Sequence, residues 1–164
     1  MGNGCMNGNK NVYYQARKEA TRYNEILSSR ERTAELLGVS QSTLADYELG
    51  ITKIVPVDKV VLMADLYNCP ELKTGYCKHE CPIGMHRPLA TTINGIEGVA
   101  LKIIRIMDFN ELKNIEKSLV LIAEDGIISE DEKPTLRRII DNFDEMSLAI
   151  SELKLIGEKV LKGK

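Results

Sequence analysis

Apolar residues recur at spacings of three and four along most of this chain, which is the period of an amphipathic helix. The segments with this pattern are residues 12–27, 30–37, 41–49, 57–67, 93–107, 112–122 and 136–160. Only 5% of the residues are aromatic and none is tryptophan, a composition that favours helices packed by leucine, isoleucine and valine. The pattern therefore predicts an all-α protein.

The segment 28–50 predicts two short helices joined by a tight turn. Ser28 or Ser29 is suited to cap the first helix, and Ser28 with Glu31 has the spacing of a capping box. Gly38 follows at the point where the chain needs a left-handed backbone conformation, which glycine adopts cheaply. These signals place the first helix between the two serines and Gly38.

The second helix of the pair is predicted over residues 41–49. Ser40 is its cap, and Gly50 ends it. Leu44 and Tyr47, three residues apart, are expected to face the core. The outward face then consists of Ser42, Ala45, Asp46 and Leu49.

Flanking helices complete the predicted core around this pair. One precedes it, one runs from Pro56 or Val57 to Tyr67, and a short fifth helix opens near Pro70. The positions expected to be buried are Tyr13, Ala16, Ala20 and Tyr23 before the turn-linked pair, Ala34, Leu36 and Leu37 within it, and Val57, Val60, Val61, Ala64 and Leu66 after it.

This part of the chain resembles the helix-turn-helix family of Cro and the phage repressors, also called the xenobiotic-response-element type. The resemblance rests on residues 34–40, AELLGVS, and on Tyr47, Glu48 and Gly50. It implies a five-helix, phage-repressor-like DNA-binding domain over residues 12–76. The second helix of the pair would be the recognition helix, which enters the major groove.

The resemblance also implies which side chains meet DNA. Gln41, Ser42 and Asp46 fall at base-facing positions; glutamine can pair with adenine, and aspartate can accept a hydrogen bond from cytosine. The positions expected to contact the DNA backbone are Arg30, Arg32, Thr43 and Lys53. For the two arginines, a solvated helix face is the competing interpretation, and many family members carry a basic residue where Asp46 stands.

The chain divides into four parts by composition. Residues 1–11, rich in Gly and Asn, predict a flexible tail; residues 12–76 are the helix-turn-helix domain, 77–92 a Cys- and His-containing linker, and 93–164 an α-helical dimerisation region. The last region predicts a helical hairpin or coiled coil with a heptad seam. The residues of that seam are Leu136, Ile139, Phe143, Met146, Ile150, Leu153 and Val160.

The seam needs a cover, and a second copy of the chain would provide one. A two-fold symmetric dimer is also what helix-turn-helix proteins use to bind two half-sites on double-stranded DNA. The formal net charge of −2 does not itself indicate nucleic-acid binding, but residues 1–88 hold eleven Lys and Arg against ten Asp and Glu, whereas residues 89–164 hold eleven against fourteen. Only the first half is therefore suited to meet phosphate.

Residues 69–88 contain the one cluster of soft metal ligands that the sequence offers. Cys69, Cys77 and Cys81, with His79 and also His86, are candidates for zinc or an iron–sulfur cluster. The spacing C-x7-C-x3-C is not the C-x2-C of common zinc modules, so reduced thiols at the edge of the core are the first interpretation. A Cys77–Cys81 disulfide is a third.

The sequence gives no indication of catalysis. It contains no glycine-rich phosphate loop, no zinc-protease helix, and no motif that places a histidine beside a Ser or Cys nucleophile. It also lacks an apolar run long enough to cross a membrane and a signal peptide, which predicts a cytoplasmic protein.

Three functions are compatible with these features. The first is a dimeric, repressor-like transcription regulator that binds specific DNA sequences, of the bacterial or mobile-genetic-element kind that the family implies. The second is a regulator that senses metal or redox state through Cys69, Cys77 and Cys81. The third is a protein-interaction adaptor whose helix-turn-helix no longer binds DNA, an alternative suggested by Asp46.

Overall fold

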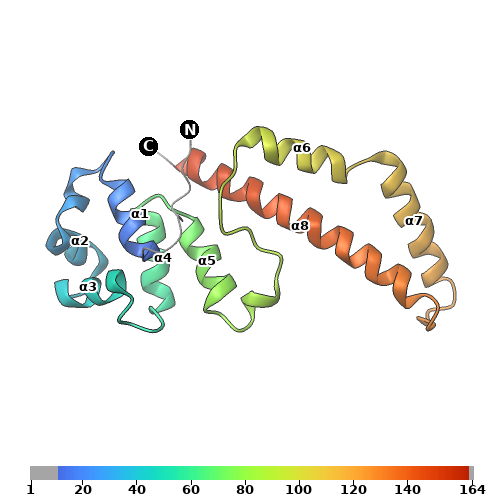
Figure 1. Ribbon diagram of the computed structural model, residues 1–164, viewed down its shortest axis with the longest axis horizontal. Helices are drawn as coiled ribbons and strands as arrows, with labels where there is room; N and C mark the ends of the chain where they lie inside the picture. The colour runs from blue at the N-terminus through green and yellow to red at the C-terminus, as the bar shows by residue number, and fades with distance from the viewer. Residues whose placement is uncertain (1–10, 163–164) are drawn as a thin grey trace.

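The computed structural model describes residues 11–162, and within that range the protein is entirely helical (Figure 1). The α-helices are α1 (Val12–Ala20), α2 (Arg30–Leu37), α3 (Gln41–Leu49), α4 (Val57–Leu66), α5 (Glu71–His79), α6 (Ile96–Ile106), α7 (Phe109–Ala123) and α8 (Lys133–Lys162), with 3-10 turns at η1 (Glu25–Ser28) and η2 (Gly84–His86). None of the helices between residues 11 and 162 combines the length and apolarity needed to span a bilayer.

Helices α1 to α5 surround one hydrophobic core. The helix pair α2 and α3 packs against α1 and α4, and the side chains that meet between them are fully or almost fully buried. The core residues are Ala16, Ala20, Leu27, Ala34, Leu37, Leu44, Tyr47, Val55, Val60, Met63, Ala64, Tyr67, Cys69 and Leu72. This arrangement confirms the predicted helix-turn-helix fold.

The caps of the two central helices explain their bounds. Ser29 accepts a hydrogen bond from the Arg32 amide at 3.3 Å, and Ser40 accepts one from the Thr43 amide at 3.0 Å. Gly38 and Gly50 end the helices with φ angles of 62° and 71°, as their positions predicted. The proposed capping box at Ser28 was wrong, because that residue lies in the preceding 3-10 turn.

The start of the chain differs from the prediction at two points. Asn11, assigned to the tail, is the N-cap of α1 and also donates to the Tyr47 carbonyl at 2.7 Å; residues 1–10 lie outside the described range. Tyr23 is 60% exposed because α1 ends at Ala20, and its hydroxyl reaches back to the Tyr67 carbonyl at 2.8 Å.

Three apolar positions expected in the core face solvent instead. Leu36 and Val57 are each more than half exposed, and Val61 is also exposed, whereas Met63 is completely buried. The period of α4 was right, but its buried face is rotated toward Val60 and Met63 because α5 covers one side of the helix.

The C-terminal region is a long helix covered along one side by two shorter ones. Figure 1 shows α8 running from the α7–α8 turn toward the helix-turn-helix domain, with α6 and α7 beside it. Asp108 caps α7 and accepts from the Asn110 and Glu111 amides, which corrects the expectation that Asn110 was the cap. Before α8, Ser129 donates to Glu132 from both its amide and its hydroxyl, each at 2.7 Å.

The predicted seam of α8 is only partly covered within one chain. Ile139 is buried and packs against α7, but Phe143, Ile150 and Leu153 are each about two-fifths exposed and Val160 is 69% exposed. The side of α8 that faces α6 carries the buried Glu152 instead, whose carboxylate accepts from Asn94 and Lys102. A stripe of apolar side chains therefore remains open along α8.

The end of α8 is docked on the helix-turn-helix domain by polar contacts. Lys73 of α5 forms an ion pair with Glu158, Lys159 pairs with the buried Glu71 at 3.2 Å, and Asn68 donates to the Lys159 carbonyl at 3.2 Å. Because these contacts come from consecutive residues of one helix, they fix the direction in which α8 leaves the domain.

The phenol of Tyr67 gives a test of this core. Its hydroxyl is buried without a hydrogen-bond partner among the described residues, and its pKa is raised by burial and by the charge of Glu48. Removing a buried, unsatisfied hydroxyl relieves a desolvation cost, so we expect Tyr67→Phe to raise the free energy of unfolding by about 1 kcal/mol. Urea unfolding measures this.

Tyr23→Phe is the matched control for that experiment. It removes a hydroxyl that does have a partner, the Tyr67 carbonyl, and should lower the free energy of unfolding by about 1 kcal/mol. A loss of stability in Tyr67→Phe as large as that in Tyr23→Phe would show that the Tyr67 hydroxyl is satisfied in solution.

Candidate nucleic-acid interface

The helix α3 presents one face to the core and one to solvent. Leu44 is fully buried and Tyr47 is 6% exposed, which anchors the inner face. On the outer face, Gln41 and Ser42 are exposed and Asp46 is half-buried. The three side chains predicted to contact bases therefore share the accessible side of one rigid helix.

Hydroxyl groups gather at the N-terminus of α3. The Ser40 hydroxyl lies 2.9 Å from the hydroxyl of Ser42 and 2.7 Å from that of Thr43, in addition to capping the helix. These contacts hold the side chains of Ser42 and Thr43 at the end of the helix where backbone amides point outward and the helix dipole favours an anion. A DNA phosphate is an anion of the right kind.

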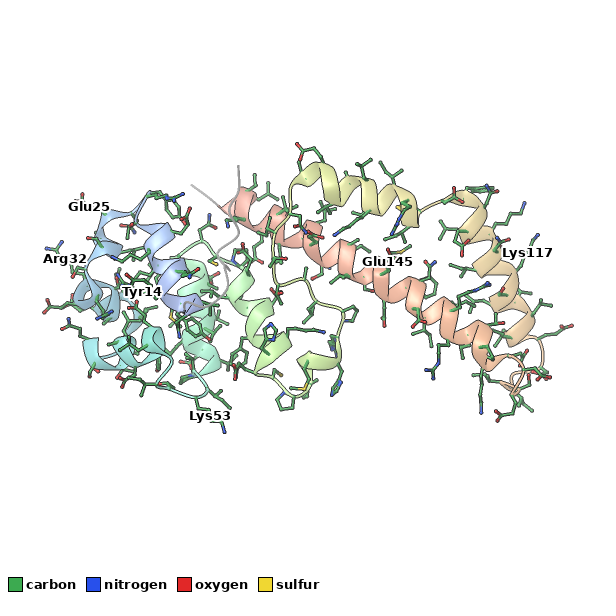
Figure 2. The ribbon with its side chains drawn as sticks, in the orientation of Figure 1. Tyr14, Glu25, Arg32, Lys53, Lys117 and Glu145 are labelled. Carbon is green, nitrogen blue, oxygen red and sulfur yellow. The ribbon has the colours of Figure 1, made fainter. Side chains whose placement is uncertain are left out.

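The chain after α3 is held to the helix by its backbone. The Asp46 carbonyl accepts from the amides of Ile51 and Thr52 at 2.9 and 3.3 Å, so the loop that carries Lys53 starts in a fixed position. In Figure 2, Lys53 extends away from the domain on this loop, and Arg32 extends away from it on α2. Both side chains are exposed and free to reach a phosphate backbone.

Arg30, the other predicted phosphate contact, has a role inside the protein. Its Nε atom donates to Glu48 at 2.9 Å, and its side chain is 34% exposed. The guanidinium is therefore held between the helix-turn-helix core and solvent rather than standing free on a helix face.

Glu48 is the centre of a buried charge cluster that fixes α3 against its neighbours. Its carboxylate accepts from Arg17 of α1 at 2.5 and 3.0 Å and from Arg30 of α2, and the Glu48 and Arg17 side chains are almost fully buried. Arg17 also donates to the Leu27 carbonyl at 2.8 Å. One carboxylate on the inner face of α3 thus connects the first three helices.

The electrostatics of this cluster favour the charged pair. Burial lowers the pKa of Arg17, but the hydrogen bond and charge of Glu48 outweigh it, so the net shift is upward. Burial raises the pKa of Tyr47, with a further contribution from Asp58. Arg17 therefore stays protonated, and Tyr47 stays neutral in the core.

The sequence contained one signal for this cluster that the prediction missed. Arg17 follows Tyr13 by four residues and Ala16 by one, so it lies on the buried face of α1, and Glu48 lies four residues after Leu44 on the buried face of α3. Charged residues are rarely buried unless they are paired. The helical period places both residues on buried faces, but it does not predict the ion pair between them, because 31 residues separate them in the sequence.

The structure does not bring the candidate metal ligands together. Cys69 is buried in the core, Cys77 and Cys81 are half-buried free thiols, and His79 is exposed at the end of α5. Among residues 11–162, no three His, Cys, Asp or Glu side chains are grouped so that they could hold a metal ion. Binding of zinc or an iron–sulfur cluster stays a prediction from the sequence.

Comparison with known proteins agrees with the geometry of the first half. Residues 28–73 match the family model described as helix-turn-helix, which is of the Cro and phage-repressor type and comprises DNA-binding regulators. The match begins before α2 and ends within α5, so it contains the whole α2–α3 pair. No curated protein and no solved structure matches the chain.

Proposed function

We propose, from the membership of residues 28–73 in the helix-turn-helix family of Cro and the phage repressors, that this protein is a sequence-specific transcription regulator. In this proposal it binds double-stranded DNA as a homodimer, with α3 of each copy in the major groove. The observation that carries the proposal is that the outer face of α3 is exposed while α1 and α2 hold its inner face.

The outer face of α3 offers the chemistry for reading bases. Gln41 can donate to and accept from the edge of adenine, Asp46 can accept from the cytosine amino group, and Ser42 can do either. Thr43, Arg32 and Lys53 then supply contacts to phosphate, which position the helix without reading sequence. With so few cations, binding to a single half-site is expected to be weak and sensitive to salt.

A weak half-site makes dimerisation part of the function. The C-terminal region exposes more large apolar side chains than is usual on the surface of a monomeric protein. Those on α8 are Ile140, Phe143, Leu148, Ile150, Leu153, Val160 and Leu161. Pairing of α8 with α8 of a second copy would cover the open stripe and link two DNA-binding domains.

The contacts between α8 and the helix-turn-helix domain relate the orientation of α3 to the way in which two copies of α8 would pair. Because Lys73, Glu71 and Asn68 hold the end of α8, the direction of each α3 is set by the way the two copies of α8 pair. A two-fold axis through the pair would present the two α3 helices to half-sites about 34 Å apart, one turn of DNA.

Selection of binding sites from random duplex DNA tests the proposal. We expect one enriched sequence with two related halves about one helical turn apart, and an affinity that falls as salt is raised. Binding to all sequences alike would contradict base recognition by α3. No enrichment and no binding at low salt would instead favour the protein-interaction adaptor.

A further inference from the structure

A cavity of about 500 Å³ lies between the start of α1, the loop after α3 and the second half of α5. The lining residues include the tyrosines Tyr13, Tyr47 and Tyr76 and, at the C-terminal end of α5, His79 and Glu80. Its size is within the range of sites that hold small organic molecules. Of the residues proposed to contact DNA, Lys53 alone lines this cavity.

Three polar side chains of the cavity wall, those of Tyr13, Tyr76 and Glu80, have no hydrogen-bond or ion-pair partner among the described residues. Within residues 11–162, the half-buried Glu80 carboxylate makes no hydrogen bond or ion pair, and the phenol oxygens of Tyr13 and Tyr76 make no hydrogen bond. Burial raises the pKa of Tyr13 to about 12, with smaller contributions from the nearby Glu80 and Tyr76. The phenols of Tyr13 and Tyr76 and the carboxylate of Glu80 thus belong to residues that line the same cavity.

Such a set of groups favours a cation. Tyrosine rings attract a positive charge through their faces, and a nearby carboxylate without its own counterion adds to that attraction. Lys53 is the one lysine or arginine among the lining residues, and in Figure 2 its side chain extends away from the domain. An anionic ligand would meet Glu80 instead of a partner.

We propose that this cavity is a binding site for a small organic cation, an amine or quaternary ammonium compound that carries an aromatic or aliphatic body. The positive group lies at Glu80 between the rings of Tyr13 and Tyr76, and the apolar body occupies the space toward Tyr47 and Leu72.

The site also borders the chain that leads away from the recognition helix. Gly50, Thr52, Lys53 and Val55 belong to the cavity wall, and this loop carries a predicted phosphate contact. An occupant would fix the loop against α5 and so alter DNA binding. This consequence rests on the proposed function, whereas binding of the cation does not.

The site is tested by titrating the full chain with benzyltrimethylammonium in the absence of DNA. The chemical shifts of the backbone amides are monitored by NMR during the titration. We expect saturable shifts at Gly50, Gly75 and Glu80, and weaker binding of benzyl alcohol and benzoate, which have the ring without the positive charge. Glu80→Gln should weaken binding of the cation about tenfold, because it removes the partnering charge and keeps the shape. Tyr76→Leu should weaken it as well.

Glu124→Gln is the control, since it removes the same charge from an exposed position after α7. Its affinity for the cation should equal that of the wild type. Equal affinity of Glu80→Gln and wild type, equal affinity for benzyl alcohol and the cation, or no shifts at the cavity would each overturn the proposal. In a second arm, saturating cation should change affinity for the selected duplex about fivefold in the wild type and not in Glu80→Gln. If the cation changes the affinity for the duplex equally in Glu80→Gln, its effect on DNA binding does not arise from this site.

Discussion

Glu48→Gln is expected to lower the free energy of unfolding of the helix-turn-helix domain by about 3–5 kcal/mol. The substitution keeps the size of the side chain but leaves the buried guanidinium of Arg17 without its counterion. The cost is large because a charge removed from water needs a partner of opposite sign, and the carbonyl of Leu27 is only a partial substitute. Denaturant unfolding followed by circular dichroism measures the loss.

Two further variants separate the ion pair from general damage. Glu35→Gln removes the same charge from an exposed position of α2 and should change stability by less than about 0.5 kcal/mol. Arg17→Met combined with Glu48→Leu removes both charges and should recover most of the stability that Glu48→Gln loses, because no unpaired charge stays buried between them. A loss below 1 kcal/mol in Glu48→Gln would mean that water reaches Arg17 in solution.

In the proposed homodimer, replacing Phe143 and Ile150 together by glutamate is expected to separate the two copies into monomers. Both side chains are 41% exposed in the single chain, so the substitutions should leave α8 folded. In the dimer they would place four negative charges in an apolar contact, which opposes association. Loss of the second half-site should then weaken DNA binding about 100-fold or more.

Sedimentation at micromolar concentration and titration of the selected duplex measure these two effects. Arg137→Glu is the matched control, because it changes the net charge of α8 by the same two units at an exposed position. It should remain dimeric. If the wild type is itself a monomer at micromolar concentration, the open stripe of α8 is not a dimer contact, and the coiled-coil interpretation is wrong.

Local signals in the sequence were sufficient to locate α3, the candidate recognition helix. Ser40 and Gly50 each act on their own helix end, through a side-chain hydrogen bond and a left-handed φ angle, so the predicted bounds of residues 41–49 are those observed. The same holds for the end of α2 at Gly38. Neither effect depends on distant parts of the chain, which is why a sequence pattern reveals both.

Features that depend on contacts between distant segments were not predictable in the same way. Leu36 and Val57 have the spacing of core residues, but which turn of an apolar stripe is covered depends on the neighbouring helix. The pairing of Arg17 with Glu48 and the docking of Lys159 on Glu71 span 31 and 88 residues. Such pairs appear only when the fold brings their elements together.

For the candidate DNA contacts, the structure can be compared with the sequence only in which side chains are exposed. Gln41 and Ser42 are exposed as expected, because the helix period decides which side of α3 faces outward. Arg30 is instead engaged by Glu48, a contact that no local pattern indicates. The cavity beside Glu80 is likewise formed by three separate segments, and no motif marks it.

The most direct test of DNA recognition by α3 is the affinity of Gln41→Ala for the selected duplex, measured by fluorescence anisotropy. Gln41 is exposed, so the fold should be unchanged. If α3 reads bases, the variant loses about 1–3 kcal/mol of binding free energy and tolerates a base change at one position of each half-site. If Gln41→Ala keeps the affinity and the base preference of the wild type, the proposed recognition of bases by the outer face of α3 is contradicted.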